Sequence, residues 1–335
     1  MSADILKIFK GAVRVDKNGG VYTPYRLTNA QLERYAKKPL CPFSKASAGI
    51  KMEFITDRDE ISFGYSYKCV WTHFDGNVPT FDIYADGVLQ KIANIEMNKP
   101  NERLYINARL CVGGEKCVTV YFPHNAFVSV FDIDIGNFEC VPERRRKLLV
   151  YGDSVSQGLM GNTSSVSYIE NYARFFDMDV LNLSVGGEVF DEEAIDENLC
   201  YLPTDVIVAL GINDAAMITD FDVIGENIKK YLAKINRIYK KCFVTVIAPT
   251  VQLTWLCGNK AEHKILDSIR NLLFAQCEKY GFFFADGRKL LPADKRFYTD
   301  DTHPNDSGFS QYALNLIKEQ IKNENLRGKD NGNKF

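Results

Sequence analysis

Four short blocks of the chain together supply the residue types that acyl transfer requires. In chain order they are Gly152-Asp153-Ser154, Gly187, Gly211-Ile212-Asn213-Asp214 and Asp300-Asp301-Thr302-His303-Pro304. They provide a serine hydroxyl, N–H groups that can face a developing negative charge, and a carboxylate close to an imidazole. Each block alone would be weak evidence for acyl transfer. All four, however, lie at or near the ends of predicted strands, so we expect them to meet at one site.

Ser154 is the candidate nucleophile and His303 is the candidate base. A serine hydroxyl becomes a useful nucleophile only when a base removes its proton. Pro304 disfavours helical geometry at His303, so Asp300 and His303 should share a turn in which the carboxylate meets one imidazole nitrogen. The other nitrogen would then face Ser154. Asp301 is the rival for the acidic role. An isolated Gly-Asp-Ser would more simply be a turn or a helix cap, but the combination favours catalysis.

Three groups are candidates for an oxyanion hole: the backbone N–H groups of Ser154 and Gly187 and the side-chain amide of Asn213. Gly187 lacks a Cβ, so its backbone can approach a substrate closely. The pair Gly186-Gly187 would serve equally in a plain turn, and Asn213 would serve equally as a cap of the turn that follows it. We interpret Asp214 as structural, with side-chain-to-backbone hydrogen bonds that hold the Asn213 loop.

The elements that would position these residues begin after Pro142. Apolar strands are predicted near residues 148–151, 180–183, 206–210, 243–247 and 282–285. Amphipathic helical segments lie between them, over about 220–239 and 265–280. Continuous apolar strands that alternate with helices indicate a parallel sheet covered on both faces, with ligand sites beyond the carboxyl ends of its strands.

The first half of the chain has a two-residue periodicity instead. Short segments rich in β-branched and aromatic residues alternate with turn-forming residues; they span 51–56, 60–67, 81–84, 118–122 and 127–131. No long helix separates them, which is typical of a β-sandwich of jelly-roll type. A short helix is predicted before them over residues 29–35, with Thr28 or Asn29 as its cap.

These patterns predict a β-sandwich domain over residues 1–142, a catalytic domain over residues 143–323 and a polar tail over residues 324–335 that should fray. The connecting segment 141–147 is short, so the two domains should share a fixed interface. Our candidate for a sandwich loop that reaches the substrate is the aromatic-bearing stretch 70–74.

Composition excludes several other classes of protein. The 335 residues are 46% hydrophobic with a formal net charge of -2, which is ordinary for a globular protein and gives no reason to expect nucleic acid or a membrane as partner. No apolar run is long enough to span a bilayer, and the N-terminus does not resemble a signal peptide. If Met1 is the natural start of the protein, its N-terminal sequence predicts a cytoplasmic location. If the natural N-terminus differs from this one, the protein would be compatible with secretion.

Metal ions and cofactors are not expected. The nine cysteines and four histidines show no Cys-x-x-Cys and no His-Glu-x-x-His spacing. We interpret the cysteines as small buried residues in a reducing compartment. The basic run 144–147 is more typical of the solvated start of a strand than of a nucleic-acid contact.

The four blocks resemble the SGNH subgroup of the GDSL esterases and lipases over about residues 146–323. Ser154 matches in the Gly-Asp-Ser block, Gly187 in the block at 182–187, Asn213 in Gly-x-Asn-Asp, and Asp300 with His303 in Asp-x-x-His-Pro. The resemblance implies a flavodoxin-like three-layer fold, ester hydrolysis through an acyl-enzyme, and no metal. Val155-Ser156-Gln157-Gly158 stands where the subgroup often has Ile-Thr-x-Gly, which is a mild departure.

A β-sandwich before such a domain is similar to the two-domain carbohydrate esterases, as in carbohydrate esterase family 2. This resemblance implies that O-acetyl groups are removed from a small-molecule or oligosaccharide ester. One alternative is another SGNH acyl hydrolase or transferase, such as a thioesterase, a lysophospholipase or an acyltransferase. Long acyl chains would need an apolar trough, which the loop 251–257 would line unless it packs as core. A non-catalytic sugar-binding protein is the second alternative.

Overall fold

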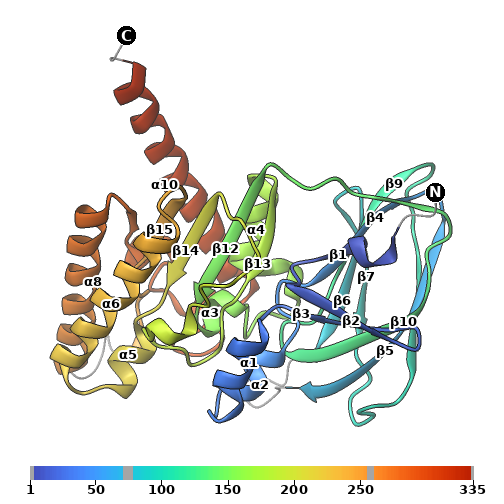
Figure 1. Ribbon diagram of the computed structural model, residues 1–335, viewed down its shortest axis with the longest axis horizontal. Helices are drawn as coiled ribbons and strands as arrows, with labels where there is room; N and C mark the ends of the chain where they lie inside the picture. Colours follow the sequence, from blue (N-terminus) through green and yellow to red (C-terminus); the bar gives the residue numbers. More distant parts are fainter. Residues whose placement is uncertain (1–3, 71–77, 255–259, 333–335) are drawn as a thin grey trace.

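A computed structural model describes residues 4–70, 78–254 and 260–332 of the chain (Figure 1). Nearly all of the stretch 70–74, predicted as a loop that reaches the substrate, lies outside these residues. The same holds for residues 255–257 of the predicted trough loop.

Two antiparallel sheets form the β-sandwich, on the right of Figure 1. One sheet has the order β1-β4-β9-β6-β7, with β11 beside β4; its strands are β1 (Phe9–Lys10), β4 (Lys51–Thr56), β6 (Thr80–Ala85), β7 (Val88–Asn94), β9 (Lys116–Tyr121) and β11 (Phe138–Cys140). The other has the order β2-β3-β10-β5-β8, with β2 (Arg14–Asn18), β3 (Val21–Tyr25), β5 (Glu60–Val70), β8 (Leu104–Arg109) and β10 (Ala126–Asp134). The single turn η1 (Ile5–Ile8) precedes β1.

The sandwich core follows from the two-residue periodicity of these strands. Successive side chains of a strand point to opposite faces, so every second residue enters the space between the sheets. Met52 and Phe54 of β4 and Phe81 and Ile83 of β6 are completely buried there. The predicted β-sandwich is confirmed.

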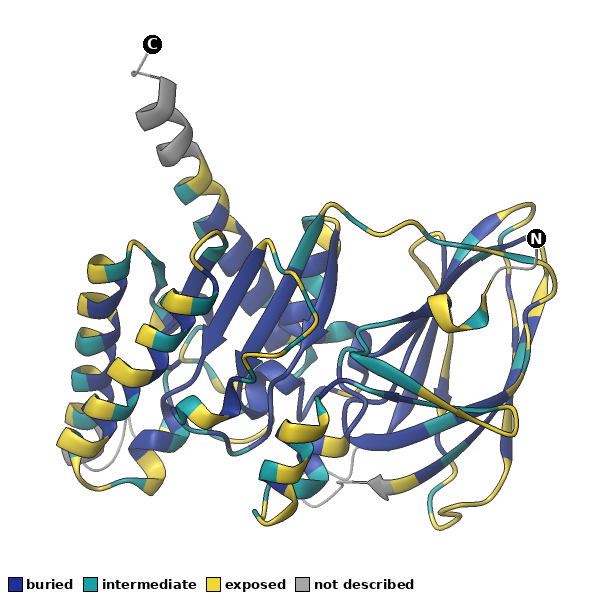
Figure 2. Cartoon of the chain, viewed as in Figure 1, coloured by how far each residue is buried: buried dark blue, intermediate teal, exposed yellow. Residues whose placement is uncertain are grey.

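The second half contains a five-stranded sheet in which every neighbouring pair is parallel. Its order is β13-β12-β14-β15-β16, with β12 (Arg146–Gly152), β13 (Met178–Asn182), β14 (Asp205–Ala209), β15 (Phe243–Ile247) and β16 (Phe283–Ala285). This order is the one found in flavodoxin-like folds, as predicted. The strands are mostly dark blue in Figure 2 because helices cover both faces.

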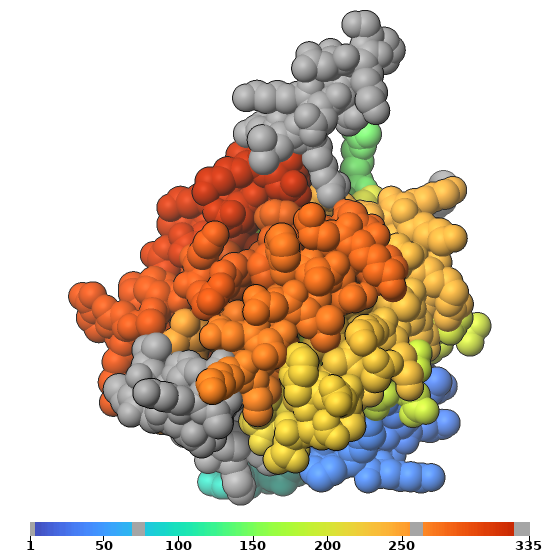
Figure 3. All heavy atoms as spheres, turned by 90° about the vertical axis from the view of Figure 1, so that its left-hand side faces the viewer, coloured from blue at the N-terminus to red at the C-terminus, as the bar shows by residue number. Residues whose placement is uncertain are grey.

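The helices separate into two layers with a hydrophobic core on each face of the sheet. On one face lie α4 (Tyr168–Phe175), α9 (Gly287–Leu290) and α10 (Asp306–Gly332); on the other lie α6 (Phe221–Ile238) and α8 (Lys260–Tyr280). Leu148 and Val150 of β12 point into the first core, whereas Leu149 points into the second. Figure 3 shows the side of the molecule away from the sandwich, where α6 and α8 pack against each other.

Short helices occupy the loops beside the sheet. They are α3 (Ser154–Gln157), η2 (Ser164–Val166), η3 (Glu192–Ala194), α5 (Ile212–Met217) and η4 (Lys295–Phe297). Among the helices that the structure describes, none has the length and apolar character needed to cross a membrane.

Two helices from the first half of the chain contribute side chains to the core on one face of the parallel sheet. They are α1 (Asn29–Ala36), which begins with a capping box of Thr28 and Gln31, and α2 (Cys41–Lys45). Tyr35 and Phe43 belong to the same core as Leu149 of β12. The part of the molecule that the parallel sheet organises therefore includes residues from before position 142.

The segment from residue 324, which we predict to be a polar tail, continues α10 to Gly332. Residues such as Phe309 and Leu316 anchor the first turns of α10 in the core beside the sheet. The segment from residue 324 to Gly332 contains no proline, so a helix that is already nucleated continues through it although Gly328, Asp330 and Asn331 are poor helix formers.

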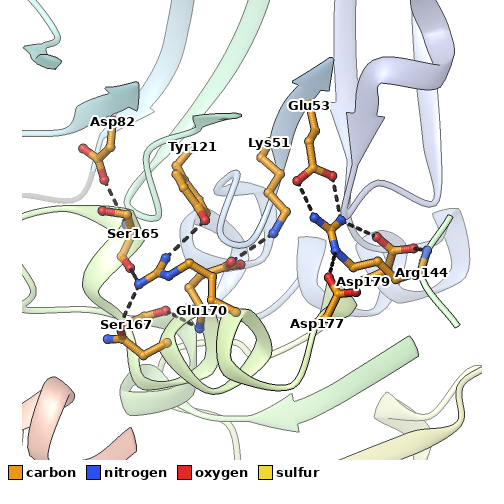
Figure 4. Close-up of polar contacts among 12 residues, drawn as sticks. Lys51, Glu53, Asp82, Tyr121, Arg144, Ser165, Ser167, Glu170, Asp177 and Asp179 are labelled. Carbon is orange, nitrogen blue, oxygen red and sulfur yellow. Dashed lines mark hydrogen bonds and ion pairs between the residues drawn. The ribbon is translucent and has the colours of Figure 1, made fainter. Parts of the chain in front are cut away.

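The two halves meet through buried ion pairs (Figure 4). Lys51 of β4 lies 3.1 Å from Glu170 of α4, and both side chains are almost completely buried. Arg144 of the connecting segment donates to both carboxylate oxygens of Glu53 at 2.7 and 2.8 Å, and to Asp179 at 3.1 Å. A paired interface of this kind agrees with the short connection between the halves.

Candidate active site

Ser154 lies at the carboxyl edge of the parallel sheet, where β12 ends and α3 begins. The side chain of Asp153 caps this helix by accepting a hydrogen bond from the Val155 N–H at 3.0 Å. A Cβ at Gly152 would lie only 2.5 Å from the side chain of Ser156. The tight passage from strand to helix therefore needs glycine before the serine, and it presents the serine at the sheet edge.

Ser154, His303 and Asp300 form a continuous chain of hydrogen bonds. Oγ of Ser154 lies 2.8 Å from Nε2 of His303, and Nδ1 of the same ring lies 2.8 Å from Oδ2 of Asp300. Burial disfavours the charge on Asp300, but the hydrogen bond and the positive charge of His303 outweigh it and lower the pKa of Asp300 to about 2. A charged carboxylate only accepts, so in the neutral form of the ring Nδ1 carries the proton and Nε2 is left to accept from the serine.

Asp300 and His303 lie in one hairpin-like loop. Tyr298 and Pro304 pair across its base as an isolated antiparallel bridge. Within the loop, Oδ1 of Asp300 accepts from the backbone N–H of His303 at 2.6 Å. The rival acid, Asp301, instead contributes its backbone carbonyl, which accepts from the loop after β15 at 2.9 Å. The geometry therefore favours Asp300 as the partner of the imidazole.

The remaining predicted site residues face the same pocket as Ser154. Gly187 has φ +83°, and a Cβ there would lie 2.7 Å from Leu40. Asn213 lies in the first turn of α5 and donates one side-chain N–H to the Glu188 carbonyl at 3.0 Å. An amide has two N–H bonds, and the second has no hydrogen-bond partner among the described residues, so it can donate to a ligand.

Asp214 links the two loops that carry the candidate oxyanion donors. Its Oδ1 accepts from the backbone N–H of Phe190 at 3.0 Å, which joins α5 to the segment after Gly187. This is a side-chain-to-backbone bond of the kind predicted for Asp214, and its partner lies in the neighbouring loop. Burial raises the pKa of Asp214 to about 7 and that of Asp153 to about 6.

The sequence of this half matches a known family. Residues 150–310 match the model of the GDSL-like Lipase/Acylhydrolase family, and the match contains Ser154, Gly187, Asn213, Asp300 and His303. Residues 150–310 form a GDSL-like acylhydrolase domain. Among curated proteins no match was found.

Solved structures share the whole two-part architecture. The chain is 16% identical to "Salicylyl-Acyltransferase SsfX3 from a Tetracycline Biosynthetic Pathway", with a TM-score of 0.78 over 94% of each chain. It is 17% identical to a family two carbohydrate esterase from Clostridium thermocellum in complex with cellohexaose, with a TM-score of 0.63 over 91% of this chain and 99% of that chain. For a family two carbohydrate esterase from Cellvibrio japonicus the identity is 14% and the TM-score 0.62, over 96% of each chain. At these identities the likeness shows the fold.

Gln157 of the GDSL-like domain holds three segments around the candidate nucleophile. Its Nε2 donates to the carbonyls of Phe43 and His124 at 3.2 and 3.1 Å, and its Oε1 accepts from the Gly186 N–H at 2.8 Å. The side chain is buried one turn after Ser154. Sequence reasoning did not single out Gln157, because all of its partners are backbone groups of remote segments.

Ser154 and His303 line a pocket of about 320 Å³. Its walls come from both halves of the molecule. From before residue 142 come Leu40, Phe43, His124 and Asn125; from the GDSL-like domain come Leu159, Met160, Met217, Gln252 and Thr302, besides the residues described above. Of the described part of the predicted trough loop, Gln252 lines the pocket, whereas Leu253 packs against the core beside α10. The wall residues of the first half were not predicted, because nothing in their spacing marks them.

Proposed function

We propose that this protein is a serine esterase that removes short acyl groups, chiefly acetyl, from the hydroxyl groups of a carbohydrate. The observation that carries the proposal is the hydrogen-bonded chain from Ser154 through His303 to Asp300 at a pocket that Gly187 and Asn213 also line. The acylhydrolase family of residues 150–310 and the fold shared with family two carbohydrate esterases support it.

The first half of the reaction forms an acyl-enzyme. Nε2 of His303 takes the proton of Ser154 as Oγ attacks the ester carbonyl, and Asp300 stabilises the resulting imidazolium. Negative charge develops on the carbonyl oxygen, toward which the candidate oxyanion groups donate; one such donor lowers the barrier by roughly 3 kcal/mol. The imidazolium then gives its proton to the departing sugar oxygen, and the ester bond to the sugar breaks.

The second half returns the enzyme to its starting state. A water molecule takes the place of the alcohol, and His303 removes its proton as it attacks the acyl carbon. Collapse of the second tetrahedral intermediate releases the free acid, and the proton returns from His303 to Ser154. The protein groups described above account for every proton transfer in both halves.

The size and the apolar walls of the pocket favour a second candidate function. Leu40, Phe43, Leu159, Met160 and Met217 line a space of about 320 Å³, which is larger than an acetyl group needs. An SGNH thioesterase, lysophospholipase or acyltransferase would use such walls for a larger acyl group. One protein of similar fold is a salicylyl-acyltransferase.

Hydrolysis of a substrate panel separates these candidates. We expect the highest kcat/KM on acetylated mono- and oligosaccharides and a decline along p-nitrophenyl esters of increasing chain length. A rise with chain length, or transfer to an added alcohol in place of hydrolysis, would favour the second candidate instead.

The nucleophile itself is tested with Ser154→Ala on the best substrate of that panel. We expect kcat to fall by roughly 10³-fold or more at an unchanged melting temperature, because within residues 4–70, 78–254 and 260–332 Ser154 is the hydroxyl that is hydrogen-bonded to Nε2 of His303. A folded variant that keeps its activity would refute the assignment of Ser154.

A further inference from the structure

The turn between β9 and β10 brings two polar residues of the sandwich, His124 and Asn125, to the candidate active site. Ser164 of η2 accepts a hydrogen bond from the backbone N–H of His124 at 2.8 Å, and its Oγ lies 3.1 Å from Nδ1 of that ring. The His124 carbonyl accepts from Gln157 at 3.1 Å. Ser164 and Gln157 both belong to the GDSL-like domain, so this turn is held in place relative to the nucleophile helix.

Asn125 is the residue of this turn that is left with an unmet hydrogen-bonding need. It is only 5% exposed, and it lines the same pocket as Ser154 and His303. Its side-chain oxygen is buried and has no hydrogen-bond partner among the residues that the structure describes. Buried polar groups without a partner are rare in native proteins. Rotation of the Asn125 amide about its terminal side-chain bond, a torsion with broad preferences, would turn this oxygen from its buried position toward the pocket, where a ligand can supply the partner.

The chemistry of that group follows from what the oxygen can do. A side-chain carbonyl oxygen only accepts, so its partner must be a donor. The acyl half of a simple ester has no donor, whereas a sugar that is not fully acylated carries free hydroxyl groups beside the ester. The donor therefore belongs to the alcohol half of the substrate.

We infer that Asn125 is a specificity-determining residue whose side-chain oxygen accepts a hydrogen bond from a free hydroxyl group next to the acylated one. The assignment rests on the proposed function and narrows it: the preferred substrate is a partly acylated carbohydrate, in which a free hydroxyl neighbours the ester. The sandwich thus takes part in substrate recognition through the turn that carries Asn125.

The test compares three esters on the full chain: a mono-O-acetylated sugar, the same sugar fully acetylated, and p-nitrophenyl acetate. The last two offer no hydroxyl group to Asn125. We expect the wild-type protein to prefer the monoacetylated sugar, and we expect Asn125→Ala to lower kcat/KM for that substrate by about tenfold, the effect of one lost hydrogen bond. The kcat/KM values for the other two esters should not change.

Two further variants make the result specific. Asn125→Asp keeps an accepting oxygen and should keep the preference for the monoacetylated sugar. Asn94→Ala changes an exposed asparagine of β7 in the same sandwich and should leave all three substrates unaffected. Melting temperatures and the rate on p-nitrophenyl acetate show whether each variant is folded.

Distinct outcomes overturn the two proposals. If wild type prefers the monoacetylated sugar and folded Asn125→Ala keeps that preference, the role of Asn125 is wrong although the proposed function stands. If Asn125→Ala does not fold, loss of the preference in Asn125→Asp overturns the assignment. If wild type itself hydrolyses p-nitrophenyl acetate better than either sugar, the proposal of a carbohydrate substrate is refuted. The proposed role of Asn125 is then refuted as well.

Discussion

Asp300 is the residue on which the orientation of the His303 ring depends. Its carboxylate accepts from Nδ1 at 2.8 Å and also from the His303 backbone N–H, which fixes both the ring and the tautomer. In Asp300→Asn the shape is kept, but an amide N–H can face Nδ1 and favour the wrong tautomer. We expect kcat to fall by roughly 10²- to 10⁴-fold with the melting temperature little changed.

The neighbouring acid provides the matched control for this prediction. Asp301→Asn makes the same chemical change one position away, where the residue contributes its backbone carbonyl to the loop. Ester hydrolysis by Asp301→Asn should remain close to that of wild type. A larger loss of kcat in Asp301→Asn than in Asp300→Asn would show that the wrong acid had been assigned.

Asp214 makes the stability of the protein depend on pH. Burial raises its pKa from 3.8 to about 7, so the folded state binds the proton more tightly than the unfolded state does. The stability that this provides is complete below a pH of about 4 and is lost as the pH rises through about 7. Asp214→Asn keeps the acceptor for the Phe190 N–H and cannot ionise.

The measurement is urea unfolding of wild type and Asp214→Asn between about pH 5 and pH 8. Wild type should lose free energy of unfolding relative to the variant as the pH rises, by on the order of 2 kcal/mol over this window. A difference between the two proteins that is constant with pH would contradict the raised pKa.

The residues of the site divide according to whether sequence could reveal them. Ser154 and His303 were predictable because acyl transfer demands those side chains at the ends of strands. Gln157 and Asn125 were not, because their roles depend on backbone groups and walls that only the folded chain brings together. An unpaired oxygen such as that of Asn125 leaves no trace in spacing or composition.

At the scale of elements, Arg26 joins α2 to the segment that follows β13. It is completely buried and donates to four backbone carbonyls at 2.6 to 3.0 Å; they belong to Phe43, Ala46, Asn182 and Ser184. Burial lowers its pKa to about 10. The segment after β13 leads to Gly187, so Arg26 supports the candidate oxyanion loop from behind.

We predict that Arg26→Lys lowers the free energy of unfolding by about 3 kcal/mol, because one ammonium group cannot satisfy carbonyls that are arranged for the planar fork of arginine. The rate on p-nitrophenyl acetate should fall as well, since the Gly187 segment loses its support. Arg58→Lys, on an exposed arginine of the sandwich, should change neither value. Equal stability of Arg26→Lys and wild type would show that the buried fork is not needed.

The strands show where periodicity succeeds as a predictor and where it does not. The strands β4, β5, β6, β9 and β10 were predicted because alternate residues are apolar and buried. We did not predict the hairpin of β2 and β3, although Gly19 and Gly20 take positive φ in its turn and mark it in the sequence. In β7 most residues are exposed, so little apolar alternation exists to be found.

At the scale of the whole molecule, residues from before position 142 complete the parallel-sheet half. Tyr35 and Phe43 share the core of Leu149, and Lys51 neutralises the buried carboxylate of Glu170 (Figure 4). Without Lys51 that carboxylate would be a buried charge without its partner, which is strongly destabilising. The change of sequence pattern near Pro142 therefore does not mark a point at which the chain separates into independent units.

We predict that the fragment of residues 143–335 does not fold into an active enzyme by itself. It lacks the buried side chains of Leu27, Tyr35 and Phe43, each of which contributes roughly 1.5 to 3 kcal/mol by burial, a sum comparable to the net stability of a typical domain. Far-UV circular dichroism during urea unfolding should show a broad transition for the fragment and a cooperative one for the full chain. The fragment should also lose hydrolysis of p-nitrophenyl acetate, which needs no contact with Asn125. A fragment that unfolds cooperatively and hydrolyses acetylated sugars with unchanged kcat/KM would reduce the sandwich to a stabilising or targeting module.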